Sequence, residues 1–562
     1  MRDPLRRVRH LAALLGLGLI LVGIVVAADP TPVVPAEALA VLRQLPVQDH
    51  GRVKPFDSFA RETLQRITGA PQVGHDDPVA TVVAMMASPD RWQDVPLVDI
   101  PFRPLQEALG LAPKTRRVSY NALVSTRALM RRLPPIVEKQ SRDEPLAMLE
   151  QETMDAYERF VAVSGLWQQS LALVPPPPGS ADPVWRPILT PEGYPQDQQA
   201  AVRAVWSVFL AAAREGPPEK ITTTARALAA RLQALNPSAV PPRWRLSWEV
   251  GYNRAQPFAI ACAVYAIAAA ALLVSVVGTS PLVPQGLPSV AAVVGTRTLW
   301  LAFALHAAGI ASRVVLGGRP PVSNFYETML WLPFVAVVVS LVMERVARVR
   351  FVAAAAALLA AIVLLLAAHV PLDSSIAPVV AVLRSNLWLT IHVLTVVASY
   401  GALALAAVVA HLYAALHLAR RQGHPLLVPL SEWLYHTIQV GVVLLAAGIM
   451  LGAVWANASW GRYWGWDPKE TWALITLLWF LALLHGRMAG WLAGLGLAAG
   501  TIAGLLLLLM TYYGVSFYLV GLHSYAGGHA KPLPPLLIGF ILVELGLLAV
   551  LGATALARRR VA

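Results

Sequence analysis

The chain falls into two regions that differ in the spacing of their apolar residues. Between residues 29 and 255, apolar positions recur at helical intervals in stretches such as 36–45, 57–67 and 200–215, with proline-rich breaks between them. This pattern predicts a mostly helical domain with long loops. From residue 256 onward, apolar runs are long enough to cross a bilayer. These predicted spans lie near residues 256–278, 291–314, 326–343, 351–370, 387–415, 434–455, 472–488, 491–513 and 535–557.

The first 28 residues combine a basic start with an apolar run. Residues 11–28 carry no charge, which fits either a cleaved signal peptide or an uncleaved anchor. With this segment the chain holds about ten spans by length. We therefore predict an all-α polytopic membrane protein. It has an N-terminal anchor or signal at 1–28, a mostly helical extracytoplasmic domain at 29–255 and a membrane domain at 256–562.

Composition and charge support this division. Only 14% of the 562 residues are charged, against about 25% in soluble domains, and seven acids follow residue 255. The net charge of +13 reflects arginines in short loops between spans rather than a nucleic-acid surface. Cys262 is the one cysteine, which excludes an intrachain disulfide, so thiol chemistry must come from a partner.

The arginines also predict the orientation. If the N-terminus is cytoplasmic, arginines at 345–350, 420–421, 487 and 558–560 all fall inside, as the positive-inside rule requires. The loop at 279–290 lacks Arg and Lys, and Arg319 is an outward exception. We expect both termini to be cytoplasmic. The outward segments are then 315–325, 371–386, 456–471 and 514–534.

Tryptophan is concentrated in one of these outward segments. Five tryptophans interleaved with glycine occupy residues 455–472. An interfacial belt places fewer indoles at a helix end, and glycine lets backbone approach a flat ligand closely. The segment therefore predicts a platform for a flat, acidic macrocycle, with indoles on the ring and Arg462 or Lys469 on a carboxylate.

Two histidines share the membrane side of this segment. His392 lies at the outer end of one predicted span, and His523 lies in the last outward segment. A lone interfacial histidine is usually a polar anchor, but neutral imidazole is also an axial ligand of heme iron. The shared side makes a pair of axial ligands the favoured interpretation.

Other histidines fall deeper. His485 lies roughly 20 Å below Trp472 at 1.5 Å per residue, near the inner side of the bilayer, where polar groups are candidate functional sites. The alternative is a side chain that extends to the interface beside Arg487. His306 and His411 also lie within spans and could complete a second site. The role of the intramembrane Glu544 stays open.

At these residues the chain resembles the heme-handling proteins of cytochrome c biogenesis, of the CcsA/ResC type in System II. Residues 460–472, WGRYWGWDPKETW, are similar to that family's tryptophan-rich WWD domain. Residues 318–327 (GRPPVSNFYE) and 513–525 (YGVSFYLVGLHSY) are similar to its early and last outward loops. Residues 45–57 (LPVQDHGRVKPFD) are similar to the segment that precedes the membrane module in fused members.

The resemblance implies a site for heme b, as substrate and ligand. His392 and His523 would be the outer iron ligands and His485 an intramembrane one. A CcsB/ResB-like membrane partner, or otherwise His306 or His411, would supply the second inner ligand. The ring and its carboxylates would contact the WWD residues, and Asp467 would cap or orient the loop beside Pro468. The expected contacts are Trp460, Arg462, Trp464, Trp466, Asp467 and Trp472.

The implied activity is that of a holocytochrome c synthase (heme lyase) component. Heme would be exported and presented for thioether attachment to the CxxCH motif of apocytochrome c, with a thiol-reducing thioredoxin-like protein as a further partner. The implied location is the bacterial inner membrane, with the WWD segment and residues 29–255 periplasmic. Two alternatives stay open: a heme-delivery protein of System I, and a transporter of another ligand such as a quinone or lipid.

Overall fold

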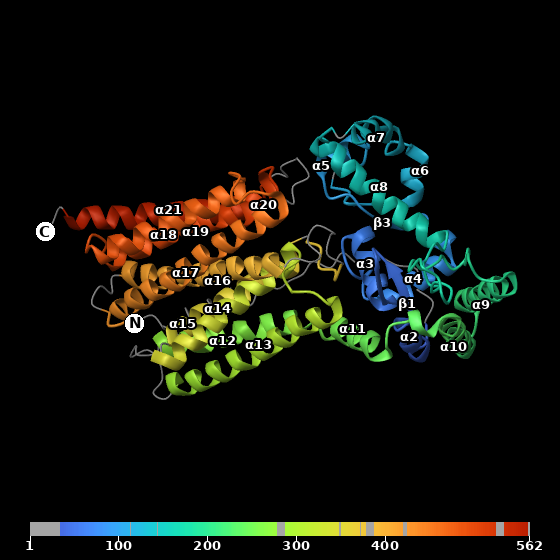
Figure 1. The fold of residues 1–562 in the computed structure, drawn as a ribbon, viewed down its shortest axis with the longest axis horizontal. Helices are drawn as coiled ribbons and strands as arrows, with labels where there is room; N and C mark the ends of the chain where they lie inside the picture. The colour runs from blue at the N-terminus through green and yellow to red at the C-terminus, as the bar shows by residue number, and fades with distance from the viewer. Residues whose placement is uncertain are drawn as a thin grey trace, which may run out of the picture.

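The structure is a computed structural model that describes residues 34–112, 114–142, 144–277, 287–347, 350–370, 372–377, 387–419, 424–523 and 533–559. The anchor or signal expected at 1–28 lies outside the described residues. An N-terminal domain sits at one end of a bundle of long helices (Figure 1). Each part has its own cluster of buried apolar side chains.

The N-terminal domain is mostly helical, and the stretches expected at 36–45, 57–67 and 200–215 correspond to α2, α3 and α9. Two small antiparallel sheets, β1-β2 and β3-β4, were not expected. Each strand has only three or four residues, too few for a clear alternation of apolar and polar positions. The elements are α2 (Ala36–Arg43), β1 (Pro46–Asp49), β2 (Arg52–Pro55), α3 (Phe56–Thr68), α4 (Pro78–Ala87), η2 (Pro89–Arg91), β3 (Pro96–Asp99), α5 (Arg103–Ala108), β4 (Arg117–Ser119), α6 (Tyr120–Thr126), η3 (Met130–Arg132), α7 (Leu133–Ser141), α8 (Met148–Trp167), α9 (Gln196–Glu215), α10 (Pro218–Leu235), η4 (Pro237–Ala239) and α11 (Arg243–Ala255).

The bundle confirms the prediction of an all-α polytopic membrane protein. Within the described residues, nine helical segments are long and apolar enough to span a membrane. The first one includes α11, which meets α12 at Gln256, so the domain's last helix leads directly into the bundle. The bundle helices are α12 (Pro257–Val277), α13 (Leu287–Gly317), α14 (Phe325–Ala347), α15 (Arg350–His369), α16 (Leu387–Leu418), α17 (Leu427–Trp460), α18 (Pro468–Met488), α19 (Gly494–Leu509), the π-helical η6 (Met510–Gly514), α20 (Val515–Tyr518) and α21 (Pro535–Arg559).

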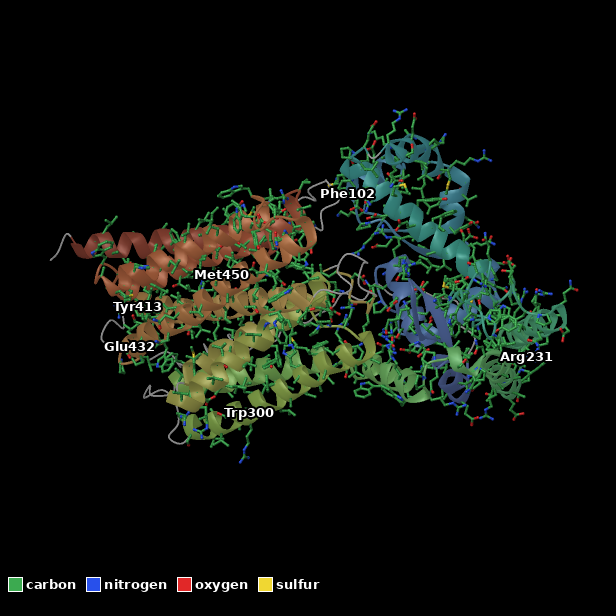
Figure 2. All side chains as sticks on the ribbon, in the orientation of Figure 1. Phe102, Arg231, Trp300, Tyr413, Glu432 and Met450 are labelled. Atoms are coloured by element: carbon green, nitrogen blue, oxygen red, sulfur yellow. The ribbon has the colours of Figure 1, made fainter. Side chains whose placement is uncertain are left out.

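Polar contacts join α11 to the rest of the N-terminal domain on one side and to the bundle on the other. Arg52 donates two hydrogen bonds of 2.7 Å to the Glu249 carboxylate on α11, and Ser58 donates a third at 2.6 Å. Farther along, the Trp248 indole donates to Ser312 of α13. The segment that contains Arg52 and Ser58 therefore serves as the docking edge for α11. Figure 2 shows nitrogen and oxygen atoms dense around the domain, whereas side chains along the bundle are mostly carbon.

Close helix packing in the bundle depends on small residues. A Cβ atom on Gly401 of α16 would lie 2.4 Å from the Leu332 carbonyl oxygen of α14, so only glycine permits this approach. On α15, the run from Ala353 to Ala357 is fully buried. The Gly401 contact holds α14 and α16 close together within the bundle.

Candidate heme site

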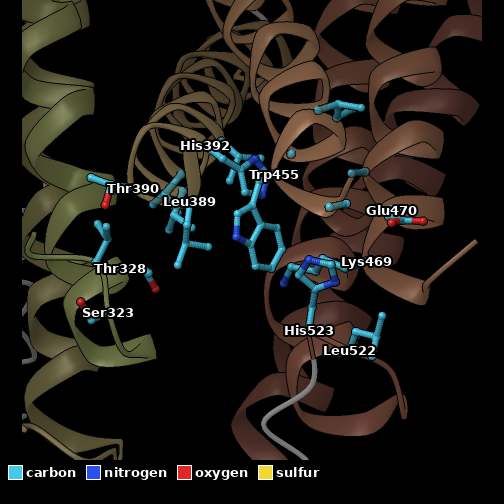
Figure 3. A pocket seen from close by; sticks show the side chains of 18 of the residues that line it. Ser323, Thr328, Leu389, Thr390, His392, Trp455, Lys469, Glu470, Leu522 and His523 are labelled. Atoms are coloured by element: carbon cyan, nitrogen blue, oxygen red, sulfur yellow. The ribbon is translucent and has the colours of Figure 1, made fainter. Parts of the chain in front are cut away.

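A cavity of about 630 Å³ opens at the end of the bundle nearest the N-terminal domain. This volume is within the range of about 300–1,000 Å³ that is typical of small-molecule sites. Its walls come from the loop before α14, the first turns of α16, the last turns of α17, the start of α18, η6 and the segment after α20 (Figure 3). The polar and aromatic lining residues include Arg319, Thr328, His392, Trp455, Trp460, Tyr463, Trp464, Lys469, Tyr512 and His523.

His392 enters the cavity from α16 in a fixed orientation. Its Nδ1 lies 2.7 Å from the Gly448 carbonyl oxygen of α17. A carbonyl only accepts, so Nδ1 carries the proton and Nε2 is left with a lone pair. Gly452 makes room for the ring, because a Cβ atom there would lie 2.6 Å from His392 Cε1. His392 therefore offers Nε2 as a metal ligand.

His523 is oriented by a carboxylate instead. Its Nδ1 lies 2.9 Å from Asp467 Oδ1, and the backbone N–H of Leu522 donates to Asp467 Oδ2 at 2.7 Å. Gly521 permits this approach, since a Cβ atom there would lie 2.5 Å from Asp467 Oδ2. The carboxylate holds both the His523 ring and the backbone that carries it.

Asp467 also begins α18. It accepts the Lys469 backbone N–H, and Glu470 accepts the N–H of Asp467 in return, a capping box with Pro468 in the first turn. The predicted capping role of Asp467 is confirmed. Burial raises the pKa of Asp467, but the hydrogen bonds from His523 and from backbone N–H groups outweigh it and hold the pKa below its ordinary value. The ionised carboxylate only accepts, so His523 Nδ1 carries its proton and Nε2 is available.

Trp455 lies against both imidazoles. Its ring centroid is 6.2 Å from that of His392, nearly parallel, and 5.9 Å from that of His523. Trp460 packs on it edge to face at 4.6 Å. The indole is only 4% exposed, and its N–H has no hydrogen-bond partner among the described residues, which costs about 1–3 kcal/mol. In Figure 3 the indole lies between the two histidines.

Lys469 is the cation at the cavity wall. Its Nζ donates to Ser516 Oγ at 2.8 Å and to the Tyr512 carbonyl at 3.1 Å. Tyr512 belongs to the π-helical turn η6, a feature common at functional sites. No ion pair joins Lys469 to a carboxylate within the described ranges. The ammonium can therefore receive an acidic group of a ligand.

A second positive group supports the opposite wall. Glu327, which is 1% exposed, accepts from Arg313 at 2.9 Å and from Arg319 at 2.6 Å. The two arginines also donate to carbonyl oxygens of Ser374, Ser375 and Ala377. Two guanidinium groups against one carboxylate leave a positive excess, and Arg319 lines the cavity.

The tryptophan-rich segment differs from the expected loop. Helix α17 continues through Trp460 and ends at Gly461, which has φ +70°. The connection to α18 is therefore residues 461–467, shorter than the outward segment expected at 456–471. Trp460 and Trp464 line the cavity. Trp466 is 70% exposed, and Trp466, Trp472 and Arg462 are not among the lining residues.

The deeper histidines do not converge on one site. His306 is fully buried, with Nε2 3.0 Å from the Leu330 carbonyl and Nδ1 3.4 Å from the Tyr265 hydroxyl. Its ring nitrogens are thus both engaged. His411 places Nε2 3.0 Å from the Glu544 carboxylate of α21. His485 is exposed on α18, with Nδ1 2.8 Å from the Leu481 carbonyl.

Sequence reasoning did not single out Trp455, Tyr512 or Arg319 as cavity residues. The sequence contained one indication of Trp455, since this residue begins the tryptophan cluster. The predicted span at 434–455, however, ended at the same residue. Tyr512 follows an uninterrupted apolar run that gives no sign of the π-helical turn. In the sequence, Arg319 stood out only as an outward exception to the positive-inside rule.

The fold and the cavity define a class: a multi-pass membrane protein whose two histidines and tryptophans face one cavity at a membrane end. The chain matches the cytochrome c assembly protein family over residues 322–523. It is 38% identical to the cytochrome c biogenesis protein CcsA of Synechococcus sp. (strain CC9902) over 240 residues, 37% of this chain and 78% of that protein. It is 34% identical to CcsA of Guillardia theta over 241 residues, 38% of this chain and 80% of that protein.

A longer similarity extends into the N-terminal domain. The chain is 30% identical to the protein NrfI of Wolinella succinogenes over 504 residues, 86% of this chain and 54% of that protein. The chain thus spans about half the length of NrfI. It belongs to the cytochrome c assembly protein family, in its CcsA-type branch.

Proposed function

We propose that the cavity holds heme b at the extracytoplasmic face and presents it for attachment to apocytochrome c. One observation carries the proposal: His392 and His523 line the same cavity, and each has Nδ1 tied back while Nε2 is available. Imidazoles with a free Nε2 are suited to bind iron from two sides, once the Trp455 indole that lies against both of them has moved aside.

The other lining residues fit the rest of the molecule. Trp460 and Trp464 offer aromatic faces to a porphyrin, and Lys469 offers an ammonium to a propionate. Arg462 is a weaker candidate for that propionate. Its guanidinium lies against Gly465, where a Cβ atom would be 2.5 Å from Cζ, and it does not line the cavity. Trp466 would contact heme only after the 461–467 connection moves, and Trp472, which lies on α18, is a weaker candidate because it does not line the cavity.

In the proposed reaction, each thiol of a CxxCH motif adds across one vinyl group. The S–H bond breaks, an S–C bond forms and the hydrogen passes to the other vinyl carbon, with no net oxidation. The protein contributes position, since the bonds form on the substrate itself. Because Cys262 is the one cysteine, a thioredoxin-like partner would keep the acceptor thiols reduced.

We further propose that heme arrives through an inner site completed by another chain. His485 is exposed on the bundle surface, and its Nε2 has no hydrogen-bond partner within the described part of the chain. A CcsB/ResB-like membrane protein would place its own histidine there. The bundle would lie in the bacterial inner membrane with both termini cytoplasmic and residues 34–255 periplasmic.

The absorbance spectrum of the purified full chain tests the outer site. We expect a Soret band with split low-spin bands, lost or shifted to high spin in His392→Ala and in His523→Ala. Cytochrome c maturation in cells should fail in both variants. Unchanged spectra and normal maturation in both would refute the proposal. A chain that binds no heme would instead favour a transporter of a quinone or lipid, and co-purification of a CcsB/ResB-like chain would argue against a System I protein.

A further inference from the structure

The two outer histidines differ in what holds their Nδ1 atoms. His392 donates to a neutral backbone carbonyl, that of Gly448, at 2.7 Å. His523 donates to the Asp467 carboxylate at 2.9 Å, and Asp467 is 7% exposed. A carboxylate behind a metal-binding imidazole draws the Nδ1 proton toward itself, so Nε2 becomes the more basic ligand.

Asp467 is itself firmly placed. It is held by the Lys469 backbone N–H and by the Leu522 N–H next to His523. The close approach at Gly521 would not survive a side chain there. His523 is thus coupled to the start of α18. On the other side, His392 is held by the α16 backbone, by the neutral Gly448 carbonyl and by packing against Trp455, with no carboxylate behind its Nδ1 among the described residues.

We infer that Asp467 makes His523 the stronger outer ligand, so that His392 is the ligand released when the acceptor's own histidine takes its place on the iron. This inference rests on the proposed heme site. It assigns Asp467 as a positioning residue that acts through His523 and does not touch the iron. Release at His392 would free the iron face on the α16 side of the cavity, while His523 keeps the heme attached to the protein.

Three full-length variants test the order of the ligands. Each is purified in detergent with heme, washed, and assayed for heme that remains and for its low-spin spectrum with added imidazole. We expect His392→Ala to retain heme through His523 and to regain the low-spin spectrum with imidazole. His523→Ala should lose heme on washing. Asp467→Asn should retain heme about 10- to 100-fold less well, the usual range for loss of such a partner.

The midpoint reduction potential of the bound heme distinguishes two effects of Asp467→Asn. One is a weaker His523 ligand, and the other is the loss of a negative charge near the iron. Loss of imidazolate character weakens binding to ferric iron more than binding to ferrous iron. Each tenfold change in the ratio of these two binding constants raises a one-electron potential by about 59 mV. Asp467→Asn should therefore raise the midpoint potential. Asparagine still caps α18, which limits structural loss. The matched control is Glu470→Gln, which removes a charge from the same capping box and cavity wall without contacting His523.

The outcomes are distinct. If Glu470→Gln raises the potential as much as Asp467→Asn, charge alone explains the effect and the inference is wrong. If His392→Ala loses heme more readily than His523→Ala, the order of the ligands is reversed and only the inference is overturned. If neither histidine variant changes the spectrum, the outer site itself is refuted together with this inference.

Discussion

The two ends of the bundle differ in where their charged and imidazole groups lie. At the end near the N-terminal domain, His392, His523 and Lys469 face one cavity. Toward the other end of α18, about 24 Å from Lys469 at 1.5 Å per residue, His485 faces outward and His411 pairs with Glu544. A single chain therefore builds a cavity at one end and leaves an exposed histidine at the other.

The largest expected effect comes from Glu327. Glu327→Ala should lower the free energy of unfolding by about 3–5 kcal/mol, because two buried guanidinium groups lose their carboxylate and cannot release a proton. Thermal unfolding in detergent measures this loss. Glu544→Ala is the matched control from the other end, since His411 can become neutral when its partner is removed. Equal losses of stability in Glu327→Ala and Glu544→Ala would contradict the proposed difference between the two ends of the bundle.

A substitution at Gly452 should have the next largest effect. It should act mainly on heme binding, and it should lower the free energy of unfolding less than Glu327→Ala does. Gly452→Ala places a methyl group 2.6 Å from His392 Cε1, and such overpacking costs about 1–3 kcal/mol. The ring has to turn away, so the low-spin heme spectrum should be lost while the chain still folds. Gly539→Ala on α21, where no atom lies within 4 Å of the added Cβ, should leave the spectrum intact. A normal spectrum in Gly452→Ala would contradict the packing described for His392.

The sequence predicts the spans of the bundle better than the contacts in the cavity, because only the spans follow a recognisable pattern of apolar residues. Spans are recognisable because apolar runs persist for about 20 residues, and the arginine bias assigns His392 and His523 to one side. Burial of Trp455 could not be predicted, because residues 456–459 are polar or small and still continue α17 until Gly461 ends it. The contact between Asp467 and His523 joins residues 56 positions apart, and no local pattern indicates it.

Trp455 gives the next prediction. One iron can take both histidines only if the indole no longer separates them, so Trp455→Leu should bind added heme roughly tenfold faster, equivalent to about 1.4 kcal/mol of barrier. Stopped-flow mixing of hemin with the heme-free protein measures the rate. Trp479→Leu is the control, because that indole donates to the Gly500 carbonyl away from the cavity. Equal rates in wild type and Trp455→Leu would show that the indole is no obstacle.

The smallest expected effect is at the other end of the bundle. His485→Ala should leave the spectrum and midpoint potential of outer-site heme unchanged in the purified chain, because among the described residues the hydrogen-bond partner of His485 is Leu481, and neither residue lines the cavity. Cytochrome c maturation in cells should nevertheless fall, since delivery of heme would depend on the inner site. A change in the outer spectrum would mean that the two ends are coupled within this chain. Normal maturation would instead mean that heme reaches the cavity by another route, and the open surface around His485 would have no part in its delivery.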